Sequence, residues 1–370
     1  MKTLKLRLKD KHCTLLAQLT KQVNFVWNYV NNLTYEHTRR TGRFLSPYDI
    51  QKYTAGASTL GLSINAQTVQ VIGTELASRR KQHKKSKLRW RVSDGPKKSL
   101  GWVPFSGQSI AYKNGQVRYA GHYFSLWDSY GLSKYNLRSG CFSQDSRGRW
   151  YLCVCVTSKE PVPSKALVST ESVGIDLGLK SFATLSNGLK IESPKLIKEY
   201  EERLSKAQRA NNKSRVRAIY AKIKNKRQDF HHKLSKSLAD KYSAIFIGDV
   251  SATQLIKFQD KTKVKITKSL LDAGWVAFKT MLKYKCENAG VWFEEVNEAY
   301  STQTCSSCGS RRNSPKGRSG LRIREWTCGG CGITHDRDIN AAMNILALGH
   351  ERLAVGSFSL KTETDVKSSI

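Results

Sequence analysis

The sequence predicts an α+β chain of several domains. Along the 370 residues, the hydrophobic pattern changes from helical spacing to strict alternation, and two Cys-x-x-Cys pairs lie in the last quarter. This length, with 39% hydrophobic content, allows two or three domains with cores of their own. We expect a β-barrel domain with a helical insertion, followed by an α/β domain that carries a metal-binding module.

The charge of the chain is strongly basic. It has 63 Lys and Arg against 29 Asp and Glu, a formal net charge of +34. Such an excess predicts a polyanionic partner, and nucleic acid is favoured over membrane because no run of about 18 apolar residues occurs. The first residues, Met1 to Leu8, alternate like a strand, so we predict no secretory signal and a cytoplasmic protein.

The front of the chain combines one strand, three helices and a β domain. Apolar spacing predicts a helix through residues 13–33, and Ser46 with Pro47 is typical of the start of a second helix. A third apolar stripe precedes a basic run, and short alternating segments follow, with a turn at Asn114-Gly115. The stripe is Val69, Ile72 and Leu76. The predicted boundaries are 1–12 and 88–160 for the β-barrel domain, 13–87 for the helical insertion and 161–171 for a linker.

The rest of the chain predicts an α/β domain. Three short strands follow one another, then a basic helical region interrupted at Asn211 and Asn212, then two apolar strands separated by a helix. This is the element order of an RNase H-like fold. The strand segments are 173–178, 182–185, 189–191, 244–247 and 291–296.

The two Cys-x-x-Cys pairs predict a structural zinc site. Cys305 and Cys308 form the first pair, and Cys328 and Cys331 form the second. Four thiolates around one Zn²⁺ leave no position for water, so the site would be closed and not catalytic. We expect the other five cysteines to be buried, reduced thiols. They are Cys13, Cys141, Cys153, Cys155 and Cys286.

Acidic residues lie at two further positions of interest. Asp176 falls within the first predicted strand of the α/β domain, where a charge is costly unless it is paired, protonated or bound to a cation. Pairing with Lys180 is the plain alternative to a metal-binding role. Asp336 and Asp338, with Asn340 on the next turn, begin a predicted helix. Each aspartate could cap this helix or face the strand of Asp176.

Four motifs occur together over residues 171–348. They are Gly174-Ile-Asp-Leu-Gly-Leu-Lys180, Tyr300-Ser-Thr-Gln-Thr-Cys-Ser-Ser-Cys-Gly309, Cys328-Gly-Gly-Cys-Gly332 and Asp336-Arg-Asp-Ile-Asn-Ala-Ala-Met-Asn-Ile345. In this combination the chain resembles the TnpB family of transposon-encoded, RNA-guided DNA endonucleases, which are related to Fanzor proteins and type V CRISPR effectors. More loosely, the front resembles the family's wedge and recognition modules.

The resemblance implies a RuvC-like nuclease site. By that likeness Asp176 is the first catalytic carboxylate, Asp338 is the last, and Asp336 only begins the helix. The family usually carries Glu-Asp after its fourth strand, whereas this chain has Gly248-Asp249. The implied boundaries are 172–300 and 334–354 for the nuclease domain, 301–333 for the zinc module and 355–370 for a disordered tail.

Three interpretations compete for the missing glutamate. Asp249 would need a bulge or a turn, because adjacent strand residues point to opposite faces. A glutamate from the neighbouring strand, about 4.8 Å away, could reach in instead, an arrangement similar to that of some TnpB-like and Fanzor proteins. We favour Glu298 over Glu295 and Asp249. In the third interpretation nothing replaces the glutamate, and the protein binds without cutting.

The resemblance also implies ligands and partners. Catalytic Mg²⁺ is expected at Asp176, Glu298 and Asp338, because all three offer oxygen ligands. The expected function is RNA-guided cleavage of double-stranded DNA beside a short motif, by a monomer per guide RNA in the nucleoid of a prokaryote. A nuclease-inactive repressor and a miniature type V CRISPR effector are the alternatives. Candidate RNA-binding residues are Lys2, Lys5, Arg7, Arg79 and Arg80, and candidate motif-reading residues are Tyr48, Gln51, Lys52, Gln67 and Gln70.

Overall fold

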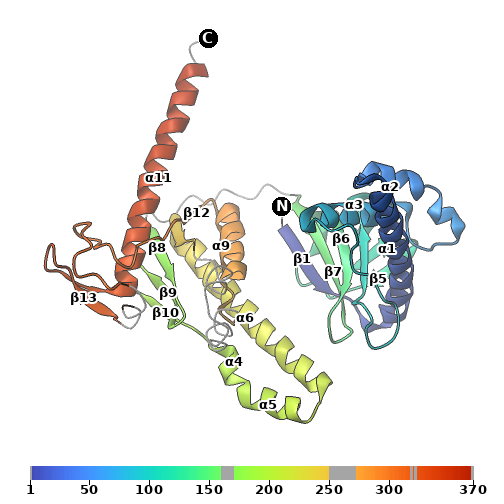
Figure 1. Ribbon diagram of the computed structural model, residues 1–370, viewed down its shortest axis with the longest axis horizontal. Coiled ribbons are helices and arrows are strands. Elements are labelled where there is room, and N and C mark those ends of the chain that lie inside the picture. The colour runs from blue at the N-terminus through green and yellow to red at the C-terminus, as the bar shows by residue number, and fades with distance from the viewer. Residues whose placement is uncertain (1, 160–170, 250–271, 317–319, 321–322, 368–370) are drawn as a thin grey trace. The chain divides into compact units, whose positions relative to one another are not determined.

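The computed structural model describes residues 2–159, 171–249, 272–316, 320 and 323–367. The chain divides into two compact units, Met1–Val162 and Pro163–Ile370 (Figure 1). The predicted linker, 161–171, lies outside the described residues except for Glu171. No helix in the described ranges is long and apolar enough to cross a membrane.

Three helices account for the predicted insertion in the first unit. The first one continues beyond residue 33 to Thr41, where Gly42 ends it in the left-handed conformation at φ 70°. The second one begins as predicted, because the Ser46 hydroxyl accepts the Asp49 N–H and the Asp49 carboxylate accepts the Ser46 N–H. The helices are α1 (Cys13–Thr41), α2 (Pro47–Tyr53) and α3 (Ala66–His83), with 3₁₀ turns η1 (Asp10–His12) and η2 (Ala57–Leu60).

Seven strands complete the described part of the first unit. They form a four-stranded sheet, β1-β7-β6-β2, and a three-stranded sheet, β3-β4-β5, which meet at one isolated bridge between Leu8 and Leu126. The hydrogen bonds of the described strands therefore do not close into the single barrel that the sequence predicts. The strands are β1 (Lys2–Arg7), β2 (Trp102–Phe105), β3 (Ile110–Lys113), β4 (Gln116–Tyr119), β5 (His122–Ser125), β6 (Tyr135–Gln144) and β7 (Trp150–Ser158), with 3₁₀ turns η3 (Gly107–Ser109) and η4 (Leu132–Lys134).

The cysteines outside the two pairs are reduced but mostly not buried. Cys286 is buried, whereas Cys13, Cys141, Cys153 and Cys155 are partly exposed. The prediction of burial was wrong for these four. On β7 the reason is alternation, since every second residue of that strand faces the core and Cys153 and Cys155 occupy the other positions.

A five-stranded mixed sheet forms the centre of the second unit, in the order β10-β9-β8-β11-β12. The first three strands of this unit pair antiparallel, and β11 lies parallel to both β8 and β12. All five strands lie where the sequence predicts them. They are β8 (Ser172–Leu177), β9 (Ser181–Leu185), β10 (Lys190–Glu192), β11 (Ala244–Gly248) and β12 (Trp292–Val296).

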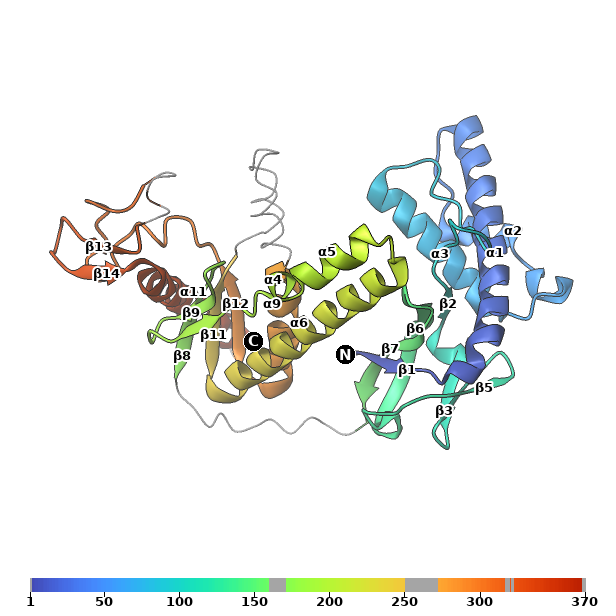
Figure 2. The same cartoon turned by 90° about the horizontal axis from the view of Figure 1, so that it is seen from below.

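Helices cover both faces of this sheet (Figure 2). Helices α6 and α9 pack on the face that carries Ile175 and Ile247, and α11 packs on the face of Phe246. Helix α11 comes unusually close at Gly174, where an added Cβ would lie 2.1 Å from the Ala342 carbonyl oxygen. The helices are α4 (Leu196–Glu199), α5 (Glu201–Arg209), α6 (Lys213–Lys241), α9 (Trp275–Ala289) and α11 (Arg337–Lys367).

Two helix ends bear on the predictions. The basic helical region breaks at Asn211 and Asn212 as predicted, and the Asn212 side chain caps α6 by accepting the Arg215 N–H at 2.9 Å. Helix α11 instead continues to Lys367, whereas the sequence predicts disorder from Val355. The polar composition of this segment indicates that it has no apolar face to pack. A helix that has already formed can nevertheless extend through it, because each added residue gains one backbone hydrogen bond.

Candidate functional site

Asp176 lies at the end of β8, on the face that α11 covers. It is two residues after Gly174 on the strand, so the two positions share a face. Ile175 on β8 is opposite Ile247 on β11, so the next residues of the two parallel strands, Asp176 and Gly248, are neighbours. Any group above Gly248 is therefore beside the Asp176 carboxyl.

The Glu298 side chain occupies the space above Gly248. A Cβ on Gly248 would lie 2.1 Å from Glu298 Oε2 and 3.2 Å from its Cδ. Two hydrogen bonds fix the Glu298 segment next to the end of β11. The Asp249 N–H donates to the Val296 carbonyl at 2.9 Å, and the Glu298 N–H donates to the Asp249 side chain, at Oδ1, at 3.3 Å. Only glycine leaves room for the carboxylate at this point of β11.

The other two candidates for the missing ligand lie elsewhere. Asp249 is exposed and its carboxylate accepts the backbone N–H of Glu298. Glu295 is opposite Ile247 on β12, on the far face of the sheet, and its Oε2 lies 2.6 Å from Lys279 Nζ of α9. Of the three, Glu298 is the acid beside Asp176.

Asp338 enters from the first turn of α11. Asp336 caps this helix as predicted, accepting the N–H groups of Asp338 at 3.1 Å and Ile339 at 3.0 Å. The Asp338 carboxylate is free of capping and accepts Arg324 Nη1 at 3.3 Å on each oxygen. The cap and the functional candidate are thus two different aspartates.

The three carboxyl groups act on one another electrostatically. Burial, together with the charges of Glu298 and Asp338, raises the pKa of Asp176 to about 7, while Arg337 and Arg324 oppose this. A carboxyl whose pKa is raised by neighbouring carboxylates marks a concentration of negative charge. Such a set can hold a divalent cation through oxygen ligands alone.

The four predicted cysteines come together. Among the described residues they form the one compact cluster of potential metal ligands, with all four sulfurs within 4.8 Å of one another. The carboxylates of Asp176, Glu298 and Asp338 are more loosely grouped. The Sγ atoms of Cys305 and Cys331 are 3.7 Å apart, and those of Cys308 and Cys328 are 3.6 Å apart. A tetrahedron with metal–sulfur bonds of about 2.3 Å has edges of about 3.8 Å, so the donor set fits a four-coordinate metal ion.

Local structure favours a thiolate at Cys328, whereas hydrogen bonding with the other cysteines raises the pKa of Cys308 to about 12. The N–H groups of Cys331 and Gly330 lower the pKa of Cys328 to about 6, and the Gly330 N–H lies 3.3 Å from Cys328 Sγ. The second pair follows β13 (Glu325–Thr327) and precedes β14 (Thr334–Asp336), which form a two-stranded hairpin. A closed loop of this kind keeps the two sulfurs of a pair on one side.

The sequence did not identify His335 as part of this module. His335 is buried, with Nε2 3.0 Å from Cys305 Sγ, and its ring packs against Trp326. Its position directly before Asp336 on a strand of only three residues was the available signal. Through this residue the cysteine cluster contacts the strand that leads into α11.

The five candidate RNA-binding side chains all have partners within the first unit. Arg80 in particular is only 2% exposed and packs over the Phe44 ring, so its assignment as a phosphate-facing residue was wrong. It lies four residues after Leu76, on the buried stripe of α3, and this spacing was readable in the sequence. The contacts of the others are Lys2 with Tyr135, Lys5 with Tyr151, Arg7 with Asp10 and Arg79 with Glu75.

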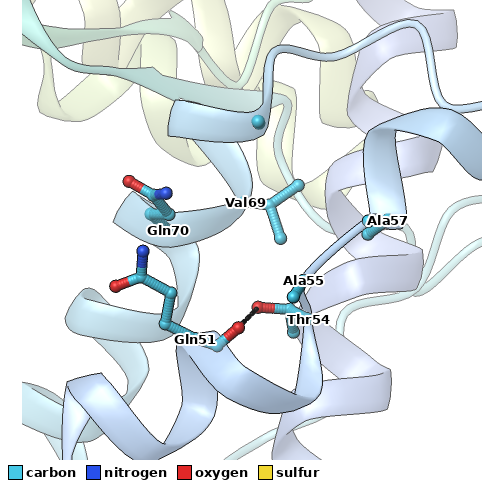
Figure 3. A pocket seen from close by; sticks show the side chains of 8 residues that line it. Gln51, Thr54, Ala55, Ala57, Val69 and Gln70 are labelled. Carbon is cyan, nitrogen blue, oxygen red and sulfur yellow. Dashed lines mark hydrogen bonds between the residues drawn. The ribbon is translucent and has the colours of Figure 1, made fainter.

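Two of the candidate motif-reading residues meet at one pocket. Gln51 of α2 and Gln70 of α3 line a pocket of about 140 Å³, and Figure 3 shows the Gln51 amide pointing towards Gln70. Gln67 is instead held by Gln108 Oε1 at 3.1 Å and by the Ser106 hydroxyl at 3.0 Å. Tyr48 and Lys52 lie outside this pocket, and Lys52 Nζ is 4.7 Å from the centre of the Tyr48 ring.

Fold and site together define an α+β protein with a group of acidic side chains at the carboxyl ends of β8 and β11 and a four-cysteine cluster whose geometry fits a metal ion. Two family models match parts of this chain: "Cas12f1-like, TNB domain" over residues 275–345 and "Probable transposase" over residues 153–259. These matches and the relatives below support the assignment to the TnpB family that the motifs predict.

Two relatives are each named "Putative RNA-guided DNA endonuclease", the second with the addition InsQ. The one from Streptomyces pristinaespiralis is 34% identical over 277 residues, which cover 70% of this chain and 65% of the relative. The one from Escherichia coli K12 is 29% identical over 233 residues, which cover 57% of this chain and 56% of the relative. The chain thus spans less than two thirds of the length of either.

A solved complex, "Cryo-EM structure of the Cas12f1-sgRNA-target DNA complex", is a more distant match. It is 16% identical with a TM-score of 0.37, over 93% of this chain and 98% of that one.

Proposed function

We propose that this protein is an RNA-guided, metal-dependent DNA endonuclease. It binds a transposon-derived guide RNA, recognises a short motif beside the target and cleaves double-stranded DNA. The observation that carries the proposal is the Glu298 carboxylate above Gly248, next to Asp176. The names of the two relatives described above support the same activity.

In this proposal Asp176, Glu298 and Asp338 hold the catalytic Mg²⁺. Bound there, a pair of divalent ions supplies an activated water and stabilises the leaving 3′ oxygen of the cleaved phosphodiester. The three side chains must be ionised to bind the metal, whereas burial first, and the charges of Glu298 and Asp338 second, raise the pKa of Asp176 when no cation balances them. Arg324, paired with Asp338, adds a positive charge beside this group.

The proposed architecture follows from the same assignment. Residues 172–300 with 334–354 form a RuvC-like domain of the RNase H-like class, supported by the strand order and by the mixed direction of pairing. Residues 301–333 form the zinc module, in which Cys305, Cys308, Cys328 and Cys331 bind one structural Zn²⁺. In the first unit, 1–12 with 88–160 form the wedge domain and 13–87 the recognition insertion.

The proposed nucleic-acid contacts are polar and basic. The net charge of +34 supports guide RNA and target DNA as partners of a monomer. Gln51 and Gln70 are the pair best placed to read a base edge, because glutamine amides match the donor and acceptor of adenine. Lys2, Lys5, Arg7 and Arg79 remain candidates for RNA phosphates, each after exchange of its present partner.

Cleavage by a purified complex tests the proposal. The chain is co-expressed with its flanking DNA, the RNA that co-purifies is sequenced, and a labelled duplex matching its guide segment is incubated with Mg²⁺. The wild-type complex should cut both strands, and Asp176→Ala should bind the duplex without cutting. Binding without any nicking by the wild type would instead identify a guide-directed repressor.

A further inference from the structure

Two asparagines on α11 bind the same two carbonyl groups. Asn340 Nδ2 donates to the Ser301 oxygen at 3.2 Å and to the Thr304 oxygen at 2.7 Å. Asn344, one turn later, donates to the same two oxygens, each at 2.7 Å. Asn340 Oδ1 also accepts the Ser306 N–H at 2.9 Å. Five hydrogen bonds thus join one face of α11 to a loop of six residues.

The backbone carbonyl groups of this loop depend on the two asparagine side chains for hydrogen-bond partners. Asn340 is 1% exposed and Ser301 is 5% exposed, so water does not compete there. The loop's own turns use its N–H groups, with Ser301 donating to the Glu298 oxygen and Gln303 and Thr304 both donating to the Tyr300 oxygen. The carbonyls of Ser301 and Thr304 are satisfied by the asparagines, and a buried carbonyl left without a partner costs free energy.

The loop lies directly between the two parts of the proposed active site. Glu298 precedes Ser301 by three residues, and the Ser301 N–H holds the Glu298 carbonyl at 3.0 Å. Asp338 precedes Asn340 by two residues on the first turn of α11. A short series of hydrogen bonds therefore runs from the Glu298 backbone, through Ser301 and Asn340, to the turn that carries Asp338.

The same loop also begins the four-cysteine module, because Cys305 lies between Thr304 and Ser306. The cysteine sulfurs lie next to one another and to His335, whereas Asn340 and Asn344 bind the backbone of Ser301 and Thr304. Closure of the module and its attachment to α11 thus use different side chains.

We propose that Asn340 and Asn344 are positioning residues for the catalytic metal site. They fix the segment of Glu298 against the turn of Asp338, and so set the spacing of the carboxylates that bind the divalent ions. The inference rests on the proposed function, because it assumes that Glu298 and Asp338 share a metal. Residues that orient metal ligands typically change metal affinity by 10- to 100-fold when replaced.

Metal binding by the full-length protein tests this role without relying on cleavage. Mn²⁺ replaces Mg²⁺ as the probe, and its binding is followed by the loss of the free-ion electron paramagnetic resonance signal. Asp176→Ala defines the ions bound at the carboxylates. Asn344→Leu removes both donors at a half-buried position while keeping the volume of the side chain, and Asn344→Ala is the second variant should the first not fold.

We expect Asn344→Leu to weaken Mn²⁺ binding at the Asp176 site by at least about tenfold, with one zinc per chain retained. Asn212→Ala is the matched control, because it removes an asparagine cap from α6 in the same unit and should leave Mn²⁺ affinity unchanged. Unchanged affinity in Asn344→Leu and Asn344→Ala would overturn the inference, as would loss of zinc together with Mn²⁺. If the wild type shows no Asp176-dependent Mn²⁺ site, the proposed function fails as well.

Discussion

The Glu298 carboxylate occupies the space that a side chain at Gly248 would need. A Cβ on Gly248 would lie 2.1 Å from Glu298 Oε2, far inside van der Waals contact. The two positions are therefore linked, since a glutamate reaching in from beyond β12 requires glycine at the end of β11. The absence of a side chain at Gly248 is a condition for the acid next to Asp176.

Replacing Gly248 with alanine should displace the Glu298 carboxylate. The nearest obstacle is the end of a flexible side chain, so the free energy of unfolding of Gly248→Ala should lie within about 1 kcal/mol of the wild-type value. Cleavage should fall by about 100-fold, because a shift of about 1 Å in a catalytic group is enough for such a loss. Thermal unfolding and single-turnover cleavage measure the two effects, and wild-type cleavage by Gly248→Ala would contradict the assignment.

The four-cysteine module should depend on zinc for its local fold. Cys305→Ser removes one of four ligands, and binding of structural Zn²⁺ contributes on the order of 10 kcal/mol. We expect loss of zinc in metal analysis and rapid hydrogen exchange over residues 301–336, with the five-stranded sheet still protected. Cys155→Ser, at a half-buried thiol outside the cluster, is the control and should retain zinc. Full zinc occupancy in Cys305→Ser would exclude it as a ligand.

The close approach of α11 to the sheet should make Gly174 intolerant of any side chain. A Cβ there would meet the Ala342 oxygen at 2.1 Å and the Leu346 nitrogen at 2.6 Å, both backbone atoms that cannot rotate away. Gly174→Ala should therefore destabilise the second unit by about 3 kcal/mol, measured by urea unfolding. Gly73→Ala is a comparison in the other unit, because its Cβ would meet side-chain atoms of Ile50, with Cγ2 at 2.8 Å, and no backbone atom. A neutral Gly174→Ala would mean that α11 packs farther away.

The buried His231 should make stability depend on pH. Burial among Phe182, Phe230 and Phe278 lowers the pKa of His231 to about 4, and its Nε2 donates to the Ala273 oxygen at 3.0 Å. The unfolded chain, with an ordinary pKa near 6.5, takes up the proton first as pH falls. Stability should therefore be full above about pH 6.5 and decline towards pH 4 by up to roughly 3 kcal/mol.

Comparison with His231→Gln isolates this contribution. The glutamine can donate to the Ala273 oxygen but does not titrate, so the difference between the two unfolding curves should shrink as the pH falls from 7 to 4. Parallel pH dependence of the two proteins would show that His231 is not the group responsible.

Local patterns were sufficient to predict the elements around the site. The five strands, the cap at Asp336 and the cysteine pairs each depend on spacing within a few residues. The choice among Glu298, Glu295 and Asp249 depends instead on which face each residue takes. That is fixed by the pairing of Gly248 with Val296 across parallel strands some fifty residues apart in sequence.

Other contacts could not be predicted from local sequence patterns, or a stronger pattern favoured a different interpretation. Asn340 and Asn344 bind carbonyls of a loop about 40 residues earlier, and no spacing rule predicts such pairs. Arg80 was missed for a different reason: its charge outweighed its position on the buried stripe of α3. The barrel was predicted from alternation alone, which gives strands but not the pairing that closes a sheet.

The central claim is that Glu298 supplies the carboxylate that Gly248 lacks. Its most direct test is the cleavage of labelled target DNA by the guide complex of Glu298→Ala, compared with that of the double variant Gly248→Glu, Glu298→Ala. We predict that Glu298→Ala binds RNA and target normally and does not cut, and that the added glutamate restores part of the rate. Full cutting by Glu298→Ala would contradict the account.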